Sequence, residues 1–208
     1  MEKDFTKEFF QQAWGNEGYY EHFSYGVGID KVCEVCLTPF FGQDKTALEI
    51  GCGGGVFTER LINKFWFVIA VDVIKMPIKF NWYNDFCYKE LPDKSFDLPG
   101  IQDGLIDFCF SYNVFCHLSN EALAEYIKNV NRVLKQGADF VFMIANFEHS
   151  KVHFVEPEKY KLGDMLPMGH FYQDERTLGI VADKDQWQII SPNLIPEHRD
   201  IIIHLRKM

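Results

Sequence analysis

The residues with the clearest chemical potential form a glycine-rich segment, Glu49-Ile50-Gly51-Cys52-Gly53-Gly54-Gly55, which closes an apolar run. Glycines allow a tight turn and let a ligand approach main-chain N–H groups without interference from a Cβ atom. About two dozen residues after Glu49, a second apolar run, Val68–Val71, ends in the carboxylate of Asp72. A helix start offers unpaired donors, and a carboxylate after the second strand suits ribose hydroxyls. The pattern predicts a nucleoside-binding site at the carboxyl edge of a parallel sheet.

The glycine spacing indicates which nucleoside is bound. The dinucleotide fingerprint is Gly-x-Gly-x-x-Gly, and its last glycine allows close packing of helix and strand. Gly51 and Gly53 fit this fingerprint, but Val56 stands at the last position. A nucleotide-dependent oxidoreductase is therefore disfavoured. The pattern present, Glu-x-Gly-x-Gly-x-Gly, resembles motif I of the class I S-adenosylmethionine-dependent methyltransferases.

This resemblance implies S-adenosyl-L-methionine as the cofactor and assigns parts of the site to it. The leading acid would face the methionine end, the glycine loop would lie under the cofactor, and Asp72 would bind the ribose. Asn84-Asp85-Phe86 resembles the segment that meets the adenine, and the segment 111–118 resembles the one that holds the methionine moiety and reaches the acceptor. The cofactor-binding residues expected on this basis are Glu49, Gly51, Cys52, Gly53, Gly55, Asp72, Val73, Asp85, Phe86, Ser111 and Asn113.

Three features of the chain depart from the family pattern or leave a role open. The interval between Asp72 and Asp85 is short and contains Pro77, so the helix usually found there must be reduced to little more than a turn. Some family members carry a metal-binding acid before the histidine of segment 111–118. Cys116 stands there, so we expect no metal. His117 is the candidate catalytic base, with a structural role as the alternative.

Alternating strand and helix patterns predict an α/β fold with a doubly wound, mostly parallel sheet. The resemblance adds a closing antiparallel strand and a total of seven strands. Ser119 is the expected cap of the helix before the fifth strand, and Gly137 its expected C′ residue. The expected strands are 46–50, 66–71, 79–83, 105–111, 140–144, 186–190 and 200–205, and the other expected helices are 4–14, 18–25, 29–39 and 56–64.

The length of 208 residues predicts one methyltransferase domain, 1–208, with an N-terminal helical cap over about 1–44. The interval from about 146 to 176, between the fifth and sixth strands, is too long for an ordinary connection. It is rich in aromatic residues, histidine and methionine. Such a composition suits a lid over a small, partly apolar acceptor. A helical insertion that packs its aromatics on the sheet is the alternative.

The amino-acid composition indicates which kinds of binding partner to expect and which to exclude. A net charge of −9 argues against nucleic acid, because phosphate binding needs a basic surface. The start of the chain lacks the apolar region of a signal peptide, and no apolar run reaches membrane-spanning length. The six cysteines are interpreted as reduced thiols of a cytoplasmic protein. Cys33 and Cys36 form a CxxC, which we interpret as core packing rather than a metal or redox site.

These inferences together predict a cytoplasmic methyltransferase that acts on an oxygen or nitrogen of a small-molecule acceptor, as a monomer or homodimer. Nucleic acid and membrane are not expected partners. The alternative is a catalytically inactive cofactor-binding or regulatory protein with the same fold.

Overall fold

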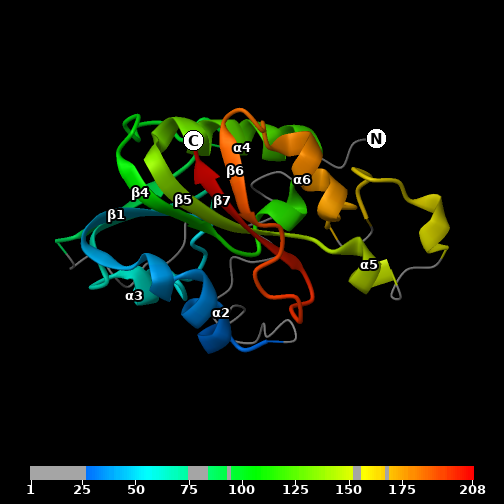
Figure 1. Cartoon of the computed structure of the whole chain (residues 1–208), viewed down its shortest axis with the longest axis horizontal. Coiled ribbons are helices and arrows are strands. Elements are labelled where there is room, and N and C mark those ends of the chain that lie inside the picture. Colours follow the sequence, from blue (N-terminus) through cyan, green and yellow to red (C-terminus); the bar gives the residue numbers. More distant parts are fainter. Residues whose placement is uncertain (1–26, 75–83, 93–94, 152–155, 167–168) are drawn as a thin grey trace.

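The computed structural model describes residues 27–74, 84–92, 95–151, 156–166 and 169–208. They form one seven-stranded sheet with the order β3-β2-β1-β4-β5-β7-β6 (Figure 1). The first five strands are mutually parallel, and β7 is antiparallel to both of its neighbours. This confirms the predicted doubly wound sheet with its closing antiparallel strand. The strands are β1 (Gly42–Ile50), β2 (Phe65–Asp72), β3 (Phe86–Glu90), β4 (Ile106–Ser111), β5 (Leu134–Ile144), β6 (Trp187–Ser191) and β7 (Ile201–Lys207).

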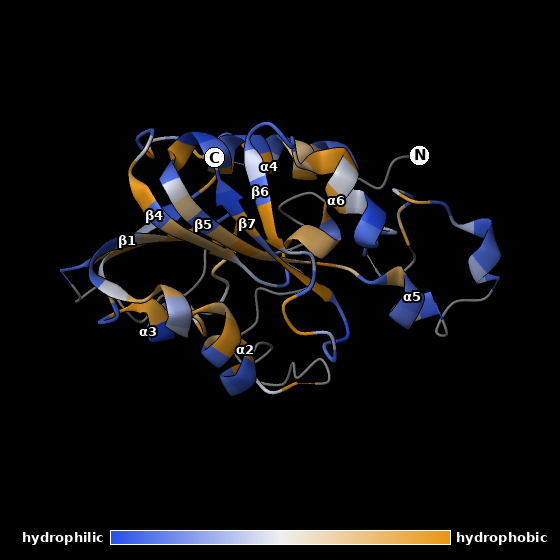
Figure 2. Ribbon diagram, in the orientation of Figure 1, coloured by the Kyte–Doolittle hydropathy of each residue, from blue (hydrophilic) through white to orange (hydrophobic). Residues whose placement is uncertain are grey.

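Helices cover both faces of the sheet. Figure 1 shows α4 and α6 on one face and α2 and α3 on the other. Successive side chains of a strand point to opposite faces, so Leu48 joins the apolar cluster beneath α4 and α6, whereas Ala47 joins the cluster beneath α2 and α3. Figure 2 shows the resulting hydrophobic colouring of the central strands. The helices are α2 (Ile29–Cys36), α3 (Thr58–Leu61), α4 (Asn120–Val133), α5 (Phe147–Ser150) and α6 (Glu175–Val181), with 3-10 turns η2 (Thr38–Phe40), η3 (Phe115–His117) and η5 (Pro157–Lys159).

The start of α4 agrees with the sequence prediction, but its end does not. The Ser119 hydroxyl accepts a hydrogen bond from the backbone N–H of Ala122, as a cap should. The helix ends at Val133, and β5 begins at Leu134. Gly137, with a φ of +76°, therefore lies within β5, where the pairing with β4 shifts register. The positive φ of Gly137 therefore belongs to the register shift between β4 and β5 and does not end a helix.

The third strand lies later in the chain than predicted. The predicted strand 79–83 falls outside the described residues, as do the predicted helices 4–14 and 18–25. The sheet instead uses Phe86–Glu90, which pairs in parallel with Val68–Asp72. This is an edge strand with mostly half-buried side chains. Its sequence mixes apolar and charged residues, so it lacks the continuous apolar run by which buried strands are recognised.

The N-terminal part that the structure describes packs as core. The Cys36 thiol is fully buried and that of Cys33 half-buried, both in the apolar cluster beneath α2 and α3. Burial raises the pKa of Cys36 to about 12, so this thiol is unreactive at neutral pH. These positions agree with the core interpretation of the CxxC. Among the described residues, no helix has the length and apolar character needed to cross a membrane.

Candidate functional site

The glycine-rich segment forms a tight loop at the carboxyl end of β1. Gly51, Gly53 and Gly55 have φ angles of +73°, +49° and +87°, in the left-handed region that glycine adopts most readily. The backbone N–H of Gly51 donates to the carbonyl oxygen of Val71 at 2.8 Å. A Cβ atom at Gly51 would lie 2.0 Å from Cγ2 of Val114. Gly51 is therefore required both by its backbone conformation and by the close approach of the segment after β4.

Asp72, the last residue of β2, holds this loop. One carboxylate oxygen accepts from the backbone N–H of Gly53 at 2.8 Å, and the other accepts from that of Ile74 at 3.0 Å. The side chain is buried, with 8% exposure. Burial raises the pKa of Asp72, and these amide donors oppose the shift. The carboxylate thus joins the ends of β1 and β2 into one polar site.

Glu49 is a second buried carboxyl group at the same edge. It is 2% exposed, and the Thr58 hydroxyl donates to it at 2.5 Å. Burial raises the pKa of Glu49 to about 8, and the nearby charge of Asp72 acts in the same direction. Glu49 is therefore mostly protonated at neutral pH. The role of Thr58, nine residues further along the chain, was missed because nothing in the local sequence marks it.

The segment after β4 completes this edge of the sheet. Ser111 pairs in register with Ile50 of β1, and its hydroxyl oxygen is buried with no hydrogen-bond partner among the described residues. Asn113 has a φ of +60°, a conformation that non-glycine residues adopt rarely and that concentrates at binding sites. The glycine loop and the unsatisfied Ser111 hydroxyl both fit a polar ligand lying across the carboxyl ends of β1, β2 and β4.

Most of the predicted cofactor residues lie at this edge, whereas Asp85 and Phe86 lie at the opposite end of β3. Asp85 immediately precedes β3, and Phe86 is the first residue of the strand. The carbonyl oxygen of Asp85 accepts a hydrogen bond from the backbone N–H of Val68. At about 3.3 Å per residue, the start of β3 lies about 13 Å from its carboxyl end. The sequence pattern placed the third strand before Asp85, whereas β3 begins after it. The residues that do lie along the carboxyl edge are Glu49, Gly51, Cys52, Gly53, Gly55, Asp72, Val73, Ser111 and Asn113.

His117 lies in η3, further along the same segment, and is only 4% exposed. Its Nδ1 lies 2.9 Å from the carbonyl oxygen of Gly169. A carbonyl can only accept, so Nδ1 carries the proton. The ring meets that of His170 edge to face, with centroids 4.7 Å apart. Burial, with a contribution from His170, lowers the pKa of His117 to about 4, so the imidazole is neutral at physiological pH.

The end of the insertion 146–176 is anchored to the segment after β4. The side-chain amide of Gln173, which is fully buried, donates to the carbonyl oxygens of Phe115 and Leu118 at 2.9 and 3.0 Å. Its amide oxygen accepts from the backbone N–H of Ala145 at 2.9 Å. These bonds fix the insertion to the ends of β4 and β5. The role of Gln173 could not be predicted from the sequence, because its hydrogen-bond partners are distant in the chain.

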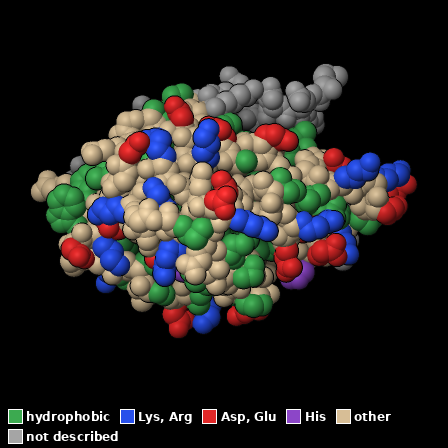
Figure 3. Space-filling model, turned by 45° about the horizontal axis from the view of Figure 1, so that its top comes forward, with side chains coloured by type: hydrophobic (Ala, Val, Ile, Leu, Met, Phe, Trp, Pro, Cys, Tyr) green, Lys and Arg blue, Asp and Glu red, His purple; other side chains and the backbone are tan. Residues whose placement is uncertain are grey.

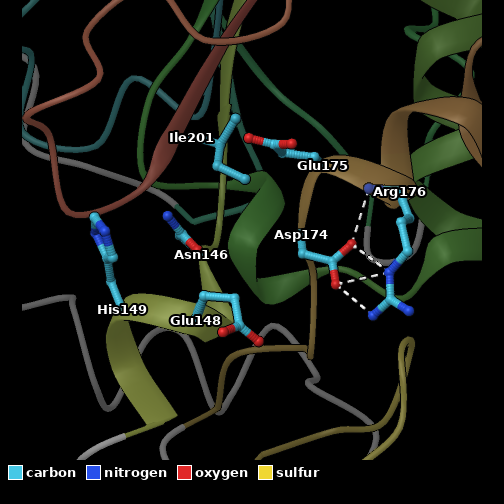
Figure 4. Close-up of a pocket in the computed structure, with 7 residues that line it drawn as sticks. All are labelled: Asn146, Glu148, His149, Asp174, Glu175, Arg176 and Ile201. Atoms are coloured by element: carbon cyan, nitrogen blue, oxygen red, sulfur yellow. Dashed lines mark hydrogen bonds and ion pairs between the residues drawn. The ribbon is translucent and has the colours of Figure 1, made fainter.

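A pocket of about 600 Å³ opens where β5 ends and β7 begins (Figure 4). Asp174, at the start of α6, forms an ion pair with the guanidinium of Arg176 at 2.6 Å. This pair neutralises the positive charge of Arg176 in the lining. The carboxylate of Glu175 is exposed, and that of Glu148 is exposed but pairs with Lys151, which lies outside the lining. The residues that line the pocket are Asn146, Glu148, His149, Asp174, Glu175, Arg176 and Ile201. The lining therefore carries an excess of negative charge.

Comparisons with known proteins agree with this geometry. Residues 48–142 match the family model described as "Methyltransferase domain". Phosphoethanolamine N-methyltransferase 1 of Triticum aestivum is 30% identical over 129 residues, which are 56% of this chain and 26% of the relative. The chain thus spans about a quarter of the length of the curated relatives that it matches.

Two solved structures share the fold. The N-methyltransferase NodS from Bradyrhizobium japonicum, solved with S-adenosyl-L-homocysteine, has a TM-score of 0.60 at 17% identity and covers 86% of this chain and 84% of its own. Geranyl diphosphate C-methyltransferase from Streptomyces coelicolor A3(2) has a TM-score of 0.68 at 12% identity, with 97% and 98% covered. The fold is that of the class I methyltransferases. Residues 48–142 therefore form a methyltransferase domain with the class I fold.

Proposed function

We propose that this protein transfers a methyl group from S-adenosylmethionine to the nitrogen of a small amine. The observation that carries the choice of acceptor is the acidic pocket at the carboxyl end of β5. It lies beside the insertion whose composition suits an acceptor lid. The exposed carboxylate of Glu175, together with that of Glu148, which also pairs with Lys151, attracts and orients a cationic amino group, while Arg176 is held by Asp174.

The roles of the cofactor residues follow from their positions. The Asp72 carboxylate would accept hydrogen bonds from the ribose hydroxyls, and Glu49 would face the amino group of the methionine moiety. Ser111 supplies a buried hydroxyl that has no partner among the described residues. The bound cofactor supplies a methyl group activated by its sulfonium. The protein contributes mainly orientation, which can lower the barrier by roughly 7–11 kcal/mol at best.

His117 is assigned a positioning role rather than that of the base. A general base works best when its pKa lies near the operating pH, and the pKa of His117 is about 4. The bound ammonium group must lose its proton before its nitrogen can attack, and the pocket carboxylates or solvent can take that proton, so transfer to nitrogen requires no histidine base. The hydrogen bond from His117 to Gly169 instead ties the insertion to the segment after β4.

Three similar proteins support nitrogen as the acceptor atom. The curated relatives from Triticum aestivum are phosphoethanolamine N-methyltransferases, and NodS is also an N-methyltransferase. The described surface agrees with a small acceptor: on the face drawn in Figure 3, basic and acidic side chains are interspersed rather than gathered into one basic region.

The test is transfer of a labelled methyl group to a panel of acceptors: ethanolamine, phosphoethanolamine and a phenol of similar size. We expect product from an amine and none from the phenol. Glu148→Gln combined with Glu175→Gln should raise the KM for the amine and leave cofactor affinity unchanged. Glu121→Gln, an exposed change on α4 away from the pocket, should have no effect.

Two results would contradict this proposal in different ways. Methylation of the phenol alone would move the acceptor from nitrogen to oxygen. Tight cofactor binding without transfer to any acceptor would favour a cofactor-binding protein that does not turn over.

A further inference from the structure

We propose that Cys116, His117 and His170 form a binding site for a divalent metal ion of the zinc type. Each residue offers one ligand atom, and the three atoms lie within 4.8 Å of one another. Two of the ligands come from η3, after β4, and the third comes from the insertion before α6. Cys116 and His117 are buried, at 0% and 4% exposure, and His170 is half-buried. Segments distant in the chain thus converge on one point with donors that zinc prefers.

The spacing of the donors is close to that of a tetrahedral centre. Zinc bonds of about 2.3 Å to sulfur and about 2.0–2.1 Å to nitrogen place neighbouring ligand atoms roughly 3.4–3.6 Å apart. The three atoms therefore need to approach by little more than about 1 Å, within the reach of side-chain rotation. The thiol proton of Cys116 leaves to solvent when the metal–sulfur bond forms.

Hydrogen bonds between the two segments that carry the ligands hold the ligands in place. The backbone N–H of Phe171 donates to the carbonyl oxygen of Cys116 at 2.9 Å, and His117 Nδ1 donates to the carbonyl oxygen of Gly169 at 2.9 Å. Residues on both sides of His170 are therefore tied to the other two ligands. A histidine that donates one ring N–H to a carbonyl is the common arrangement at metal sites, because it sets the tautomer and orients the ring.

The surrounding charges can accommodate a cation. Arg199 adds positive charge near His170, but its guanidinium pairs with the carboxylate of Asp200 at 2.9 Å. The Cys116 thiolate would add negative charge at the centre itself. Ring packing between His117 and His170 is the simpler explanation of their contact, but it does not account for the thiol at the same point.

A thiolate also changes which metal the site selects. The sequence analysis predicted no metal because Cys116 replaces an acidic residue. Carboxylates suit magnesium, whereas a Cys and two His ligands suit zinc or cobalt. Three protein ligands leave a fourth position for water or a ligand atom, as in catalytic zinc sites. Cys116 Sγ also lies 3.7 Å from Oδ1 of Asn113, so the cluster lies beside one of the predicted cofactor residues.

The experiment is titration of the full chain, freed of metal by a chelator, with Co²⁺ alone. We expect one equivalent to bind with d–d absorption of tetrahedral intensity and a thiolate-to-cobalt charge-transfer band. Zn²⁺ should displace the cobalt and abolish both signals. Cys116→Ser should remove the charge-transfer band. His170→Gln, at the least buried ligand, should weaken binding by more than the roughly 10–100-fold typical of losing an outer-shell partner.

Cys33→Ser is the matched control, because Cys33 is a half-buried thiol outside the proposed site. This variant should bind cobalt as the wild type does. Circular dichroism of each metal-free variant verifies that it is folded. The proposal is overturned if the wild type binds no cobalt, or if the charge-transfer band survives in Cys116→Ser and disappears in Cys33→Ser.

Discussion

The elevated pKa of Glu49 predicts that cofactor binding is coupled to proton release. Glu49 is fully buried beside Asp72, with a pKa of about 8. If its carboxylate meets the amino group of the bound cofactor, binding must favour the ionised form. At pH 7 only about a tenth of the free protein has this group ionised. One pKa unit corresponds to about 1.4 kcal/mol, so the cofactor affinity should fall about tenfold for each pH unit below 7.

The assay is calorimetric titration with S-adenosylmethionine at pH 6.5 in two buffers of different ionisation enthalpy. The difference in observed heat counts the protons, and we expect nearly one released per cofactor. The cofactor's own amino group stays protonated below its usual pKa of about 7.7–8.0, so it contributes little here. Glu49→Gln should release no proton, and its affinity should not change between pH 5.5 and 7.

Glu59→Gln is the control, since this exposed residue lies on the same short helix as Thr58. It should behave as the wild type. The reasoning about Glu49 is refuted if the wild type releases no proton and binds the cofactor equally well at pH 5.5 and pH 7.

The same pKa shift affects the stability of the free protein. A carboxyl group whose pKa is raised on folding contributes stability below its unfolded value of 4.5, and this contribution is lost as the pH rises towards about 8. By pH 7 the loss amounts to about 3 kcal/mol. Glu49→Gln removes this loss, so urea unfolding should show a larger gain in stability for the variant at pH 7 than at pH 5. An equal gain at both pH values would contradict the shift.

Three further substitutions test individual contacts. Asp72→Ala removes charge-assisted hydrogen bonds worth roughly 1.5–3 kcal/mol each, so cofactor affinity measured by calorimetry should fall at least about tenfold; an unchanged Kd in a folded variant would disprove the ribose assignment. Gly51→Ala places a Cβ atom against Val114 in a left-handed conformation, and we expect a loss of at least about 1–3 kcal/mol in urea unfolding. Gly104→Ala, with a positive φ but no atom within 4 Å of its Cβ, should lose less, and an equal loss in both would refute the steric argument. Gln173→Leu leaves buried backbone groups unpaired, at about 1–3 kcal/mol each, so limited proteolysis should cut the insertion faster; an unchanged cleavage rate would show that these bonds do not anchor it.

The central part of the site could be predicted from sequence because its signals are local. The glycine loop combines a buried strand, residues able to adopt positive φ, and an acid at the end of the next strand. Each of these leaves a mark within a few residues. Their meeting point follows from the parallel sheet, since the carboxyl ends of parallel strands share one edge. The predicted cap at Ser119 succeeded for the same reason.

The errors arose where long-range pairing decides the structure. β3 is a half-buried edge strand of mixed apolar and charged residues, so its position was hard to recognise, and Asp85 lies at its start rather than after its end. Gly137 resembled a helix C′ residue, but a register shift between β4 and β5 uses its positive φ. The contacts of Thr58 and Gln173 join residues between 9 and 58 positions apart. Such contacts become visible only once the strands are paired.

The most direct test of the central claim is calorimetric titration of the full chain with S-adenosylmethionine, S-adenosylhomocysteine and NADH. The account predicts micromolar binding of the first two and none of NADH. Binding of NADH with no binding of either S-adenosyl compound would contradict it.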